Sequence, residues 1–254
     1  MKWRTAGLVL LPTIAAAQGF PWELSPRLPA HAPTLFLGTA IHIAYTPSVA
    51  ALEAIEGEWT CATYRHGTGW ETSLGVHAEW WYASQSAFRS TLAVEQAALR
   101  FAAPSQPLPL RDGRLLLTEY QLRSNFWLAR VEVAMKQRLW SWLWLSLGGW
   151  MALQWRVREE QWEVVLSPSD YQFRTFPPSR QRRLEQAHSI DLRPYGAGIH
   201  LRIGYDLILA RRFPFYAAPA IVLGSSIISL AKAAAWQRWE AGVELPLFWG
   251  LPRH

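Results

Sequence analysis

The sequence predicts an all-β fold, an eight-stranded antiparallel up-and-down transmembrane β-barrel with short periplasmic turns and longer extracellular loops. Segments in which apolar and polar residues alternate recur along residues 34–250. Each segment is near or beyond the roughly 9–11 residues that a tilted membrane strand needs. Aromatic residues gather at the segment ends. Because backbone amides in hydrocarbon need partners within the protein, a sheet that spans a membrane has to close into a barrel.

The composition favours a lipid environment. Of 254 residues, 50% are hydrophobic, 16 are Trp and only 17% are charged, whereas about 25% are charged in an ordinary globular protein. The net charge of +6 is too small to indicate a nucleic-acid partner. Cys61 is the single cysteine, so no internal disulfide is available.

The first 17 residues are typical of a secretory signal peptide. Lys2 and Arg4 precede the apolar run Ala6 to Ile14 and the small residues Ala15 to Ala17,. A spanning helix needs about 20 apolar residues, so we expect cleavage after residue 17 instead of a retained anchor. The mature chain then starts with a short periplasmic segment, residues 18–33. Of the 25 basic residues two are lost, which leaves 23 against 19 acidic ones and a net charge of +4.

In the first four predicted strands the charges fall on one face. Odd-numbered residues from Leu35 to Tyr45 and even-numbered ones from Trp70 to Trp80 are mostly apolar. The third strand alternates most weakly. In the fourth, Trp127 to Met135 supply an apolar face, with Arg130 and Glu132 on the other. These strands span residues 34–46, 68–82, 88–101 and a segment that ends near Lys136.

The last four predicted strands repeat the pattern. Trp140, Trp142, Trp144 and Trp150 share one parity of the fifth strand. The sixth and eighth strands again place charges on a single face, and a short turn that contains residues 210–212 joins the sixth to the seventh. These strands span residues 140–155, 196–209, 213–228 and 236–249.

One segment has a helical alternative. Phe213 to Ala231 carries no charge over 19 residues, which approaches the length of a spanning helix. It contains Pro214, Pro219 and Gly224, and its apolar residues alternate with small ones. We therefore interpret it as a strand.

The predicted connections alternate in length. Those after strands two, four and six take about three to five residues, and those after strands one, three and five about 12 to 40,. Membrane barrels have short turns on the periplasmic side and longer loops outside. The chain fits this rhythm apart from a modest final loop around Lys232 to Ala235.

Parity alone does not say which face points inwards, so a soluble eight-stranded barrel of the lipocalin type is the alternative. The aromatic residues favour a membrane barrel over a soluble one, because they occupy strand ends on the apolar parity, as girdle residues do at the two membrane interfaces. The predicted girdle consists of Trp70, Trp80, Trp127, Trp140, Tyr205, Trp239 and Trp249.

The leader, the alternation and the aromatic strand ends resemble the small bacterial outer-membrane β-barrel superfamily. Arg130-Val131-Glu132-Val133, a tight turn and Leu147-Gly148-Gly149 are similar to the central hairpin of the PorT-like outer-membrane β-barrel domains. The resemblance covers residues 34–249 and implies a fold more than a function. Such chains often end on an aromatic residue, whereas five residues follow Trp249 here, which leaves the end of the last strand open.

The inward parity predicts a filled lumen. Eight strands enclose a space that side chains can fill, and an unpaired charge there costs several kcal/mol, roughly. Charges of both signs should therefore pair into a plug. The predicted network consists of Glu79, Arg89, Glu95, Arg130, Glu132, Arg202, Asp206, Glu240 and Glu244.

The alternative to a purely structural lumen is catalysis. A histidine with a carboxylate and a serine forms a hydrolase-like constellation, and lipid-modifying enzymes exist among outer-membrane barrels. No G-x-S-x-G elbow is present, and the histidine spacing fits no recognisable metal motif,. The candidate groups are His42, His77, His200, Glu79, Asp206 and Ser73.

The longest predicted loop, Arg156 to Arg193, contains a basic cluster of Arg180, Arg182 and Arg183. Such a cluster can bind lipopolysaccharide phosphates, and a solvated loop is the ordinary alternative. The leading interpretation is a monomeric, non-enzymatic outer-membrane barrel without cofactor or metal, with a structural, surface-binding or envelope-assembly role and with membrane lipid as its partner. The alternative is a lipid A or phospholipid hydrolase or acyltransferase.

Overall fold

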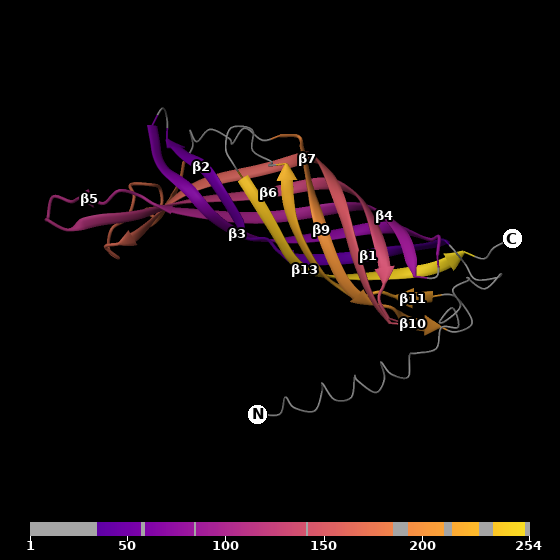
Figure 1. The fold of residues 1–254 in the computed structure, drawn as a ribbon. Helices are drawn as coiled ribbons and strands as arrows, with labels where there is room; N and C mark the ends of the chain where they lie inside the picture. The colour runs from indigo at the N-terminus through magenta and orange to yellow at the C-terminus, as the bar shows by residue number, and fades with distance from the viewer. Residues whose placement is uncertain are drawn as a thin grey trace, which may run out of the picture.

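The computed structural model describes residues 35–56, 59–83, 85–140, 142–184, 193–210, 215–228 and 236–251. The predicted signal peptide and the segment 18–33 lie outside these residues. The all-β antiparallel prediction is confirmed (Figure 1). The strands are β1 Leu35–Tyr45, β2 Ser48–Glu56, β3 Trp59–Trp81, β4 Ser86–Pro104, β5 Leu108–Pro109, β6 Leu115–Arg138, β7 Leu143–Ser167, β8 Gln181–Arg183, β9 Tyr195–Tyr205, β10 Leu207–Ala210, β11 Phe215–Ala217, β12 Ala220–Ile228 and β13 Trp236–Leu251.

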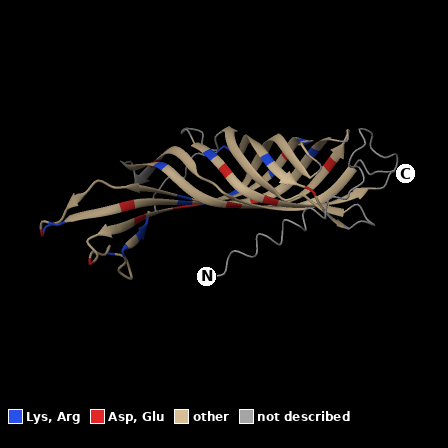
Figure 2. Ribbon diagram, turned by 60° about the horizontal axis from the view of Figure 1, so that its bottom comes forward, with Lys and Arg blue, Asp and Glu red and all other residues tan. Residues whose placement is uncertain are grey.

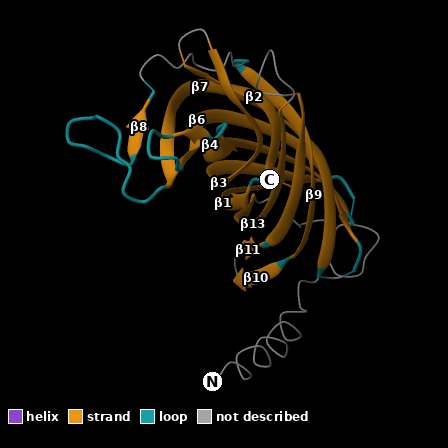
Figure 3. Cartoon of the chain, turned by 90° about the vertical axis from the view of Figure 1, so that its left-hand side faces the viewer, coloured by secondary structure: helices purple, strands orange, loops and turns teal. Residues whose placement is uncertain are grey.

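The main strands pair in a ring, β1-β3-β4-β6-β7-β9-β12-β13, which closes because β13 also pairs with β1 (Figure 3). Along one row of paired residues, Tyr45 leads through Trp70 and Ala98 to Asn125 on β6. In the other direction the same row passes through β13, β12, β9 and β7 to Met135. The row therefore reaches β6 at residue 125 in one direction and at residue 135 in the other, and these positions are ten residues apart. Closure of a tilted sheet requires such a stagger.

The apolar parity of the ring points outwards. Ile41, Leu92 and Val133 are 57%, 56% and 58% exposed, whereas Glu79 and Glu95 of the other parity are fully buried. A soluble barrel has the opposite arrangement, with its apolar side chains in the core. The outer surface of the ring is therefore suited to hydrocarbon.

Two aromatic belts bound this apolar surface. One, the turn-end belt, lies near the turns that join β3 to β4 and β6 to β7, and the other, the far belt, lies near the opposite ends of these strands. On both β3 and β13 the belts are ten residues apart, Trp70 to Trp80 and Trp239 to Trp249. At about 3.3 Å per residue and a tilt near 40°, this separation is about 25 Å, the height of the apolar band of outer-membrane barrels. The turn-end belt comprises Trp80, Phe88, Tyr205, Phe215 and Trp249, and the far belt comprises Tyr45, Trp70, Trp127, Trp155 and Trp239.

Five of the seven predicted girdle residues are exposed, and Trp127 and Tyr205 are half-buried. Trp140 was expected to open the fifth strand, but it lies in the turn before β7, where its amide donates to the Leu143 carbonyl. The strand starts three residues later than the aromatic parity predicts, at Leu143, because Leu139 and Trp140 both donate backbone hydrogen bonds to the Leu143 carbonyl.

The predicted long loop after the first strand was wrong. Pro47 interrupts the strand, but β2 continues in the same direction and pairs with the start of β3, so only residues 57–58 connect them. Likewise β7 continues to Ser167 and pairs with β6 throughout, beyond a bulge beside Trp155. These extensions project at one end of the ring, together with β5 (Figure 1). Their outer faces carry charges, so they lack the alternation of apolar and polar residues from which the strands were predicted.

The sixth and seventh predicted strands are each interrupted. Asp206 separates β9 from β10, and Ala218-Pro219 separate β11 from β12. Residues 211 and 212 of the predicted turn and the final loop at 232–235 lie outside the described residues. The described part of the chain contains no helix of the length and apolarity that crossing a membrane requires, and residues 220–228 of the helical alternative form β12.

Candidate functional site

The lumen is charged in its middle and apolar at both ends. β13 shows the order: Trp236 at one end, then Arg238, Glu240 and Glu244, then Phe248 at the other. We call the two apolar groups the far plug and the turn-end plug. The far plug includes Tyr64, Phe101, Phe126, Leu128 and Trp236, and the turn-end plug includes Phe36, Trp81, Trp144, Tyr216 and Phe248. The plugs separate the charges between them from water.

Arg130 of β6 is the centre of the charged middle. Its Nη1 lies 3.2 Å from Glu71, 3.1 Å from Glu95 and 3.2 Å from Glu240, and its Nε lies 2.7 Å from Glu132. Its guanidinium also lies 4.8 Å from the ring centroid of Trp150. Four strands thus place a carboxylate on one cation, which compensates for the loss of its hydration.

A second arginine extends the network towards the turn end. Arg202 lies 2.5 Å from Glu132 through Nη2 and 2.6 Å from Glu244 through Nε. Glu244 also accepts a hydrogen bond from Arg89. On the far side, Arg238 Nη1 lies 3.1 Å from Glu95. The central network therefore links five strands of the ring through side chains as well as through the backbone.

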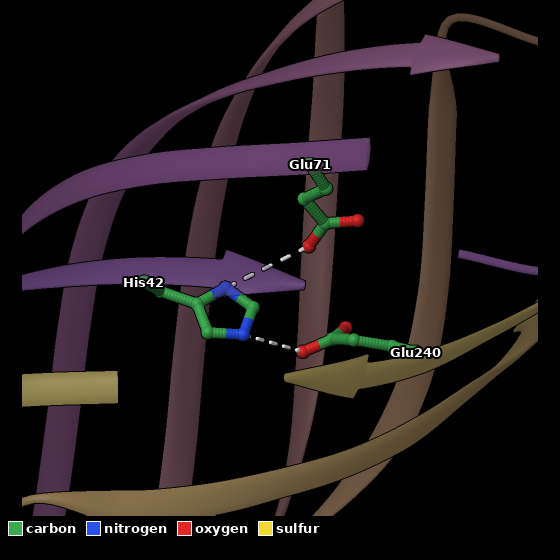
Figure 4. Close-up of side chains that lie close together, drawn as sticks. All are labelled: His42, Glu71 and Glu240. Atoms are coloured by element: carbon green, nitrogen blue, oxygen red, sulfur yellow. Dashed lines mark ion pairs between the residues drawn. The ribbon is translucent and has the colours of Figure 1, made fainter. Parts of the chain in front are cut away.

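His42, Glu71 and Glu240 lie close together in the network (Figure 4). His42 Nδ1 is 3.8 Å from Glu71, and its Nε2 is 3.4 Å from Glu240. One ligand atom from each lies within 4.8 Å of the others, a spacing that a bound metal ion can bridge. Arg130 and Arg238 already contact these carboxylates, so the arginines supply the positive charge that a metal ion would bring.

The charges of the central network are unequal among the described residues. Five carboxylates (Glu71, Glu95, Glu132, Glu240, Glu244) face four arginines (Arg89, Arg130, Arg202, Arg238). His42, His77 and His200 lie within 4 Å of Glu240, Glu244 and Glu132, respectively. One bound proton, on a carboxylate or on one of these histidines, balances the network, because an uncompensated buried charge is unfavourable.

A separate cluster surrounds Lys136 beside the turn-end plug. Its Nζ lies 3.3 Å from Glu79 and 2.9 Å from Asp206, and Asp206 also pairs with Arg138 at 2.9 Å. Glu79 accepts hydrogen bonds from the Tyr216 hydroxyl at 2.5 Å and the Trp81 indole at 2.6 Å. The ammonium also lies 4.7 Å from the Trp144 ring centroid. Cation–π contacts and carboxylates together replace its hydration.

The nine charges predicted for the lumen all take part in these two clusters. The prediction missed Glu71, Lys136, Arg138 and Arg238, which are equally engaged. Strand parity places three of them in the lumen, and only Arg138, which lies between the fourth and fifth predicted strands, had no such signal.

The predicted catalytic candidates fall into different clusters. The three histidines belong to the central network, whereas Glu79 and Asp206 surround Lys136. Ser73 lies opposite His42 in the sheet, and no hydrogen bond between their side chains is found among the described residues. A contact that was not predicted joins Thr91 Oγ1 to His77 Nδ1 at 2.6 Å, with Glu244 3.6 Å from Nε2. Thr91 is only 6% exposed.

The predicted surface arginines lie beside the extension of β7. Arg180 donates to the Val165 carbonyl at 3.0 Å, and Arg182 pairs with Glu163 at 2.6 Å. Arg183 is more open, with Glu160 at 3.9 Å and a side chain 56% exposed. Two of the three therefore serve contacts within the chain.

No protein-family model matches the sequence, and no curated protein matches it. The chain is similar to the solved structure of Ail, the attachment invasion locus protein of Yersinia pestis, in complex with the heparin analogue sucrose octasulfate. This likeness has 11% identity and a TM-score of 0.27 over 83% of this chain and 98% of that chain. It is also similar to the outer membrane protease OmpT from Escherichia coli, with 9% identity and a TM-score of 0.28 over 89% and 100%.

A further similar structure is the outer membrane protein OprG from Pseudomonas aeruginosa, with 9% identity and a TM-score of 0.36 over 87% of this chain and 98% of that chain. At such identities and TM-scores, the function of this chain has to be argued from its own residues.

Proposed function

We propose that the chain is a monomeric integral protein of a bacterial outer membrane, exported through a cleaved signal peptide and folded as an eight-stranded up-and-down barrel. The observation that carries the proposal is the inverted arrangement of its side chains. An apolar outer band about 25 Å high lies between two aromatic belts, while the charges fill the lumen. The short turns then face the periplasm, and the extensions of β2, β3, β6 and β7 reach outside.

The filled lumen supports a structural, surface-binding or envelope-assembly role, not that of a pore. Trp81, Trp144 and Phe248 in one plug and Tyr64 and Phe126 in the other are at most 1% exposed. A solute would have to displace both plugs and the ion pairs between them. The PorT-like relationship belongs to this proposal, since it rests on the hairpin around Arg130 alone.

Two measurements on detergent-extracted full-length protein test the proposal. A closed barrel resists unfolding until it is boiled, so unboiled and boiled samples should migrate differently on a gel. After reconstitution in a planar bilayer, the protein should produce no stable ion conductance. Identical migration of the two samples contradicts the barrel, and a steady open-channel current contradicts the filled lumen.

The second candidate is a lipid-modifying enzyme, hydrolase or acyltransferase, and the Thr91–His77 contact favours it. A hydroxyl that is hydrogen-bonded to a histidine beside a carboxylate matches the activated-nucleophile arrangement. If it acts on lipid A or phospholipid, His77→Gln should abolish product formation while leaving heat-modifiable migration intact. An inactive wild-type protein in the same assay rejects this candidate.

A further inference from the structure

The outer face just beyond the far belt carries four arginines, which we call the arginine layer: Arg100, Arg123, Arg156 and Arg158. We propose that this layer binds the phosphate groups of membrane lipids that surround the barrel, with a bisphosphorylated lipid such as lipid A as the fitting chemistry. The inference rests on the proposed outer-membrane location and adds to it a partner and the residues that contact it.

The register fixes the height of the layer. Arg156 of β7 pairs directly with Trp127 of the far belt, and Arg158 pairs with Asn125 two residues further along. Arg123 is four residues beyond Trp127 on β6, which is about 10 Å along the barrel axis for tilted strands. Lipid phosphates lie at this level, because the aromatic belt marks the edge of the hydrocarbon.

The side chains are available to an external anion. Arg100, Arg156 and Arg158 are exposed, and the half-buried Arg123 lies 5.6 Å from the Trp162 ring centroid. Among the described residues Arg156 makes no ion pair or side-chain hydrogen bond. It is a free cation beside the belt.

Arg100 and Arg123 give the second argument. They occupy directly opposed positions of β4 and β6, where like charges destabilise a sheet. Both donate to the same oxygen, Gln121 Oε1, at 2.7 Å and 3.3 Å, and so their guanidinium groups converge. An anion held between them removes the repulsion, and arginine suits phosphate because its fork can donate two hydrogen bonds.

Charges of both signs lie beyond the layer. On the outer face of the described rows that hold the layer, Glu160 is the acid, and it pairs with Arg158 at 2.9 Å. Glu119 of β6 lies further from the belt, and at the tip Arg114 pairs with Asp112 and Asp170. The extensions thus carry basic and acidic positions together (Figure 2). The choice of a membrane lipid over a soluble polyanion therefore rests on the height of the layer beside the belt.

The test measures lipid affinity by native mass spectrometry of the full-length protein in detergent. Bisphosphorylated lipid A is titrated into wild type, into Arg123→Gln/Arg156→Gln and into Arg111→Gln/Arg174→Gln. The last variant loses the same charge from exposed positions further out. We expect the layer variant to bind about tenfold more weakly, because charge-assisted contacts to phosphate are lost. The control variant should bind as wild type does, and dephosphorylated lipid should bind all three equally weakly.

Equal lipid A affinities of the two double variants overturn the proposal. Equal affinities of the wild type for lipid A and for dephosphorylated lipid overturn it as well. Competition by soluble pyrophosphate at the same concentration as the lipid assigns the layer to a free anion instead and also overturns it. Heat-modifiable gel migration of each variant is measured in parallel, and Arg100→Gln replaces the double variant if that one does not fold. If the wild type itself lacks heat-modifiable migration, the proposed membrane barrel fails before the lipid partner is in question.

Discussion

The indole of Trp144 lies against Gly204, its partner across β7 and β9, so closely that a Cβ on Gly204 would meet the Cζ2 atom of Trp144 at 2.5 Å. Trp150 and Gly198 repeat the arrangement six residues further along the same strand pair, also at 2.5 Å. Each indole ring packs against the backbone of the glycine on the neighbouring strand. In this way a narrow lumen accommodates two tryptophans.

A methyl group at Gly204 should therefore destabilise the barrel. We expect Gly204→Ala to lower the free energy of unfolding by about 1–3 kcal/mol, the usual cost of overpacking a filled core. Urea unfolding in lipid vesicles, followed by tryptophan fluorescence, measures the change. Gly149→Ala is the control, because its Cβ has ordinary contacts and faces outwards. Equal losses in the two variants contradict the packing argument.

Loss of Arg130 should be the most damaging single change in the lumen. Arg130→Met leaves Glu71, Glu95 and Glu240 without their shared cation, and breaking a buried pair in this way costs about 3–5 kcal/mol. The same unfolding experiment applies, with the exposed Arg111→Met as control, for which a change within about 0.5 kcal/mol is expected. A loss below about 1 kcal/mol for Arg130→Met would mean that water reaches the network.

The lipid-facing surface can be tested with one residue type at two heights. Leu92 lies on the outer face between the belts and Leu115 lies beyond the far belt, and they are 56% and 54% exposed. Leu92→Arg should cost about 2–4 kcal/mol in vesicles and Leu115→Arg at most about 1 kcal/mol, because the penalty for arginine falls towards the interface. Similar penalties at both positions rule out the membrane band at this height.

The outer tip should respond to acid without affecting the barrel. The Arg114 guanidinium donates hydrogen bonds to Asp112 and Asp170 and holds the pKa of both carboxyls below their ordinary value of 3.8. Because the folded-state values are lowered, the contacts are complete above pH 3.8 and are lost as the pH falls through the lowered values. Carbon NMR titration should show Arg114→Gln restoring the ordinary pKa of Asp170. Unshifted titration in that variant argues against the contact.

Strand parity was sufficient to predict the outward-facing residues of the ring, because Leu92 and Val133 follow a strict alternation. It failed beyond the far belt. There, charged residues such as Arg158 and Glu160 lie on the outer side of a paired strand, so charges no longer mark a single face and the segment resembles a loop. Pro47 hid the continuation of the first strand in the same manner, since a proline usually ends one.

The lumen was only partly predictable. Parity indicates that Arg130 and Glu240 point inwards, but not that they meet across 110 residues of sequence. The partner of each charge depends on the ten-residue stagger of the ring, which no local pattern encodes. For this reason the sequence grouped the histidines with Glu79 and Asp206, whereas the structure pairs them with Glu71, Glu132, Glu240 and Glu244.

The closing strand β13 has a consequence for the order of assembly. It is the last strand of the described residues, and it brings Glu244 to Arg202 and Glu240 to Arg130 while it forms the seam with β1. Before this strand docks, Arg89 and Arg202 lack the carboxylate of Glu244, and Arg130 lacks that of Glu240. Sealing of the seam and completion of the central network are therefore a single event. A chain that stops at residue 235 should accumulate as a boil-insensitive, membrane-excluded intermediate, and heat-modifiable migration of that fragment would separate the two steps.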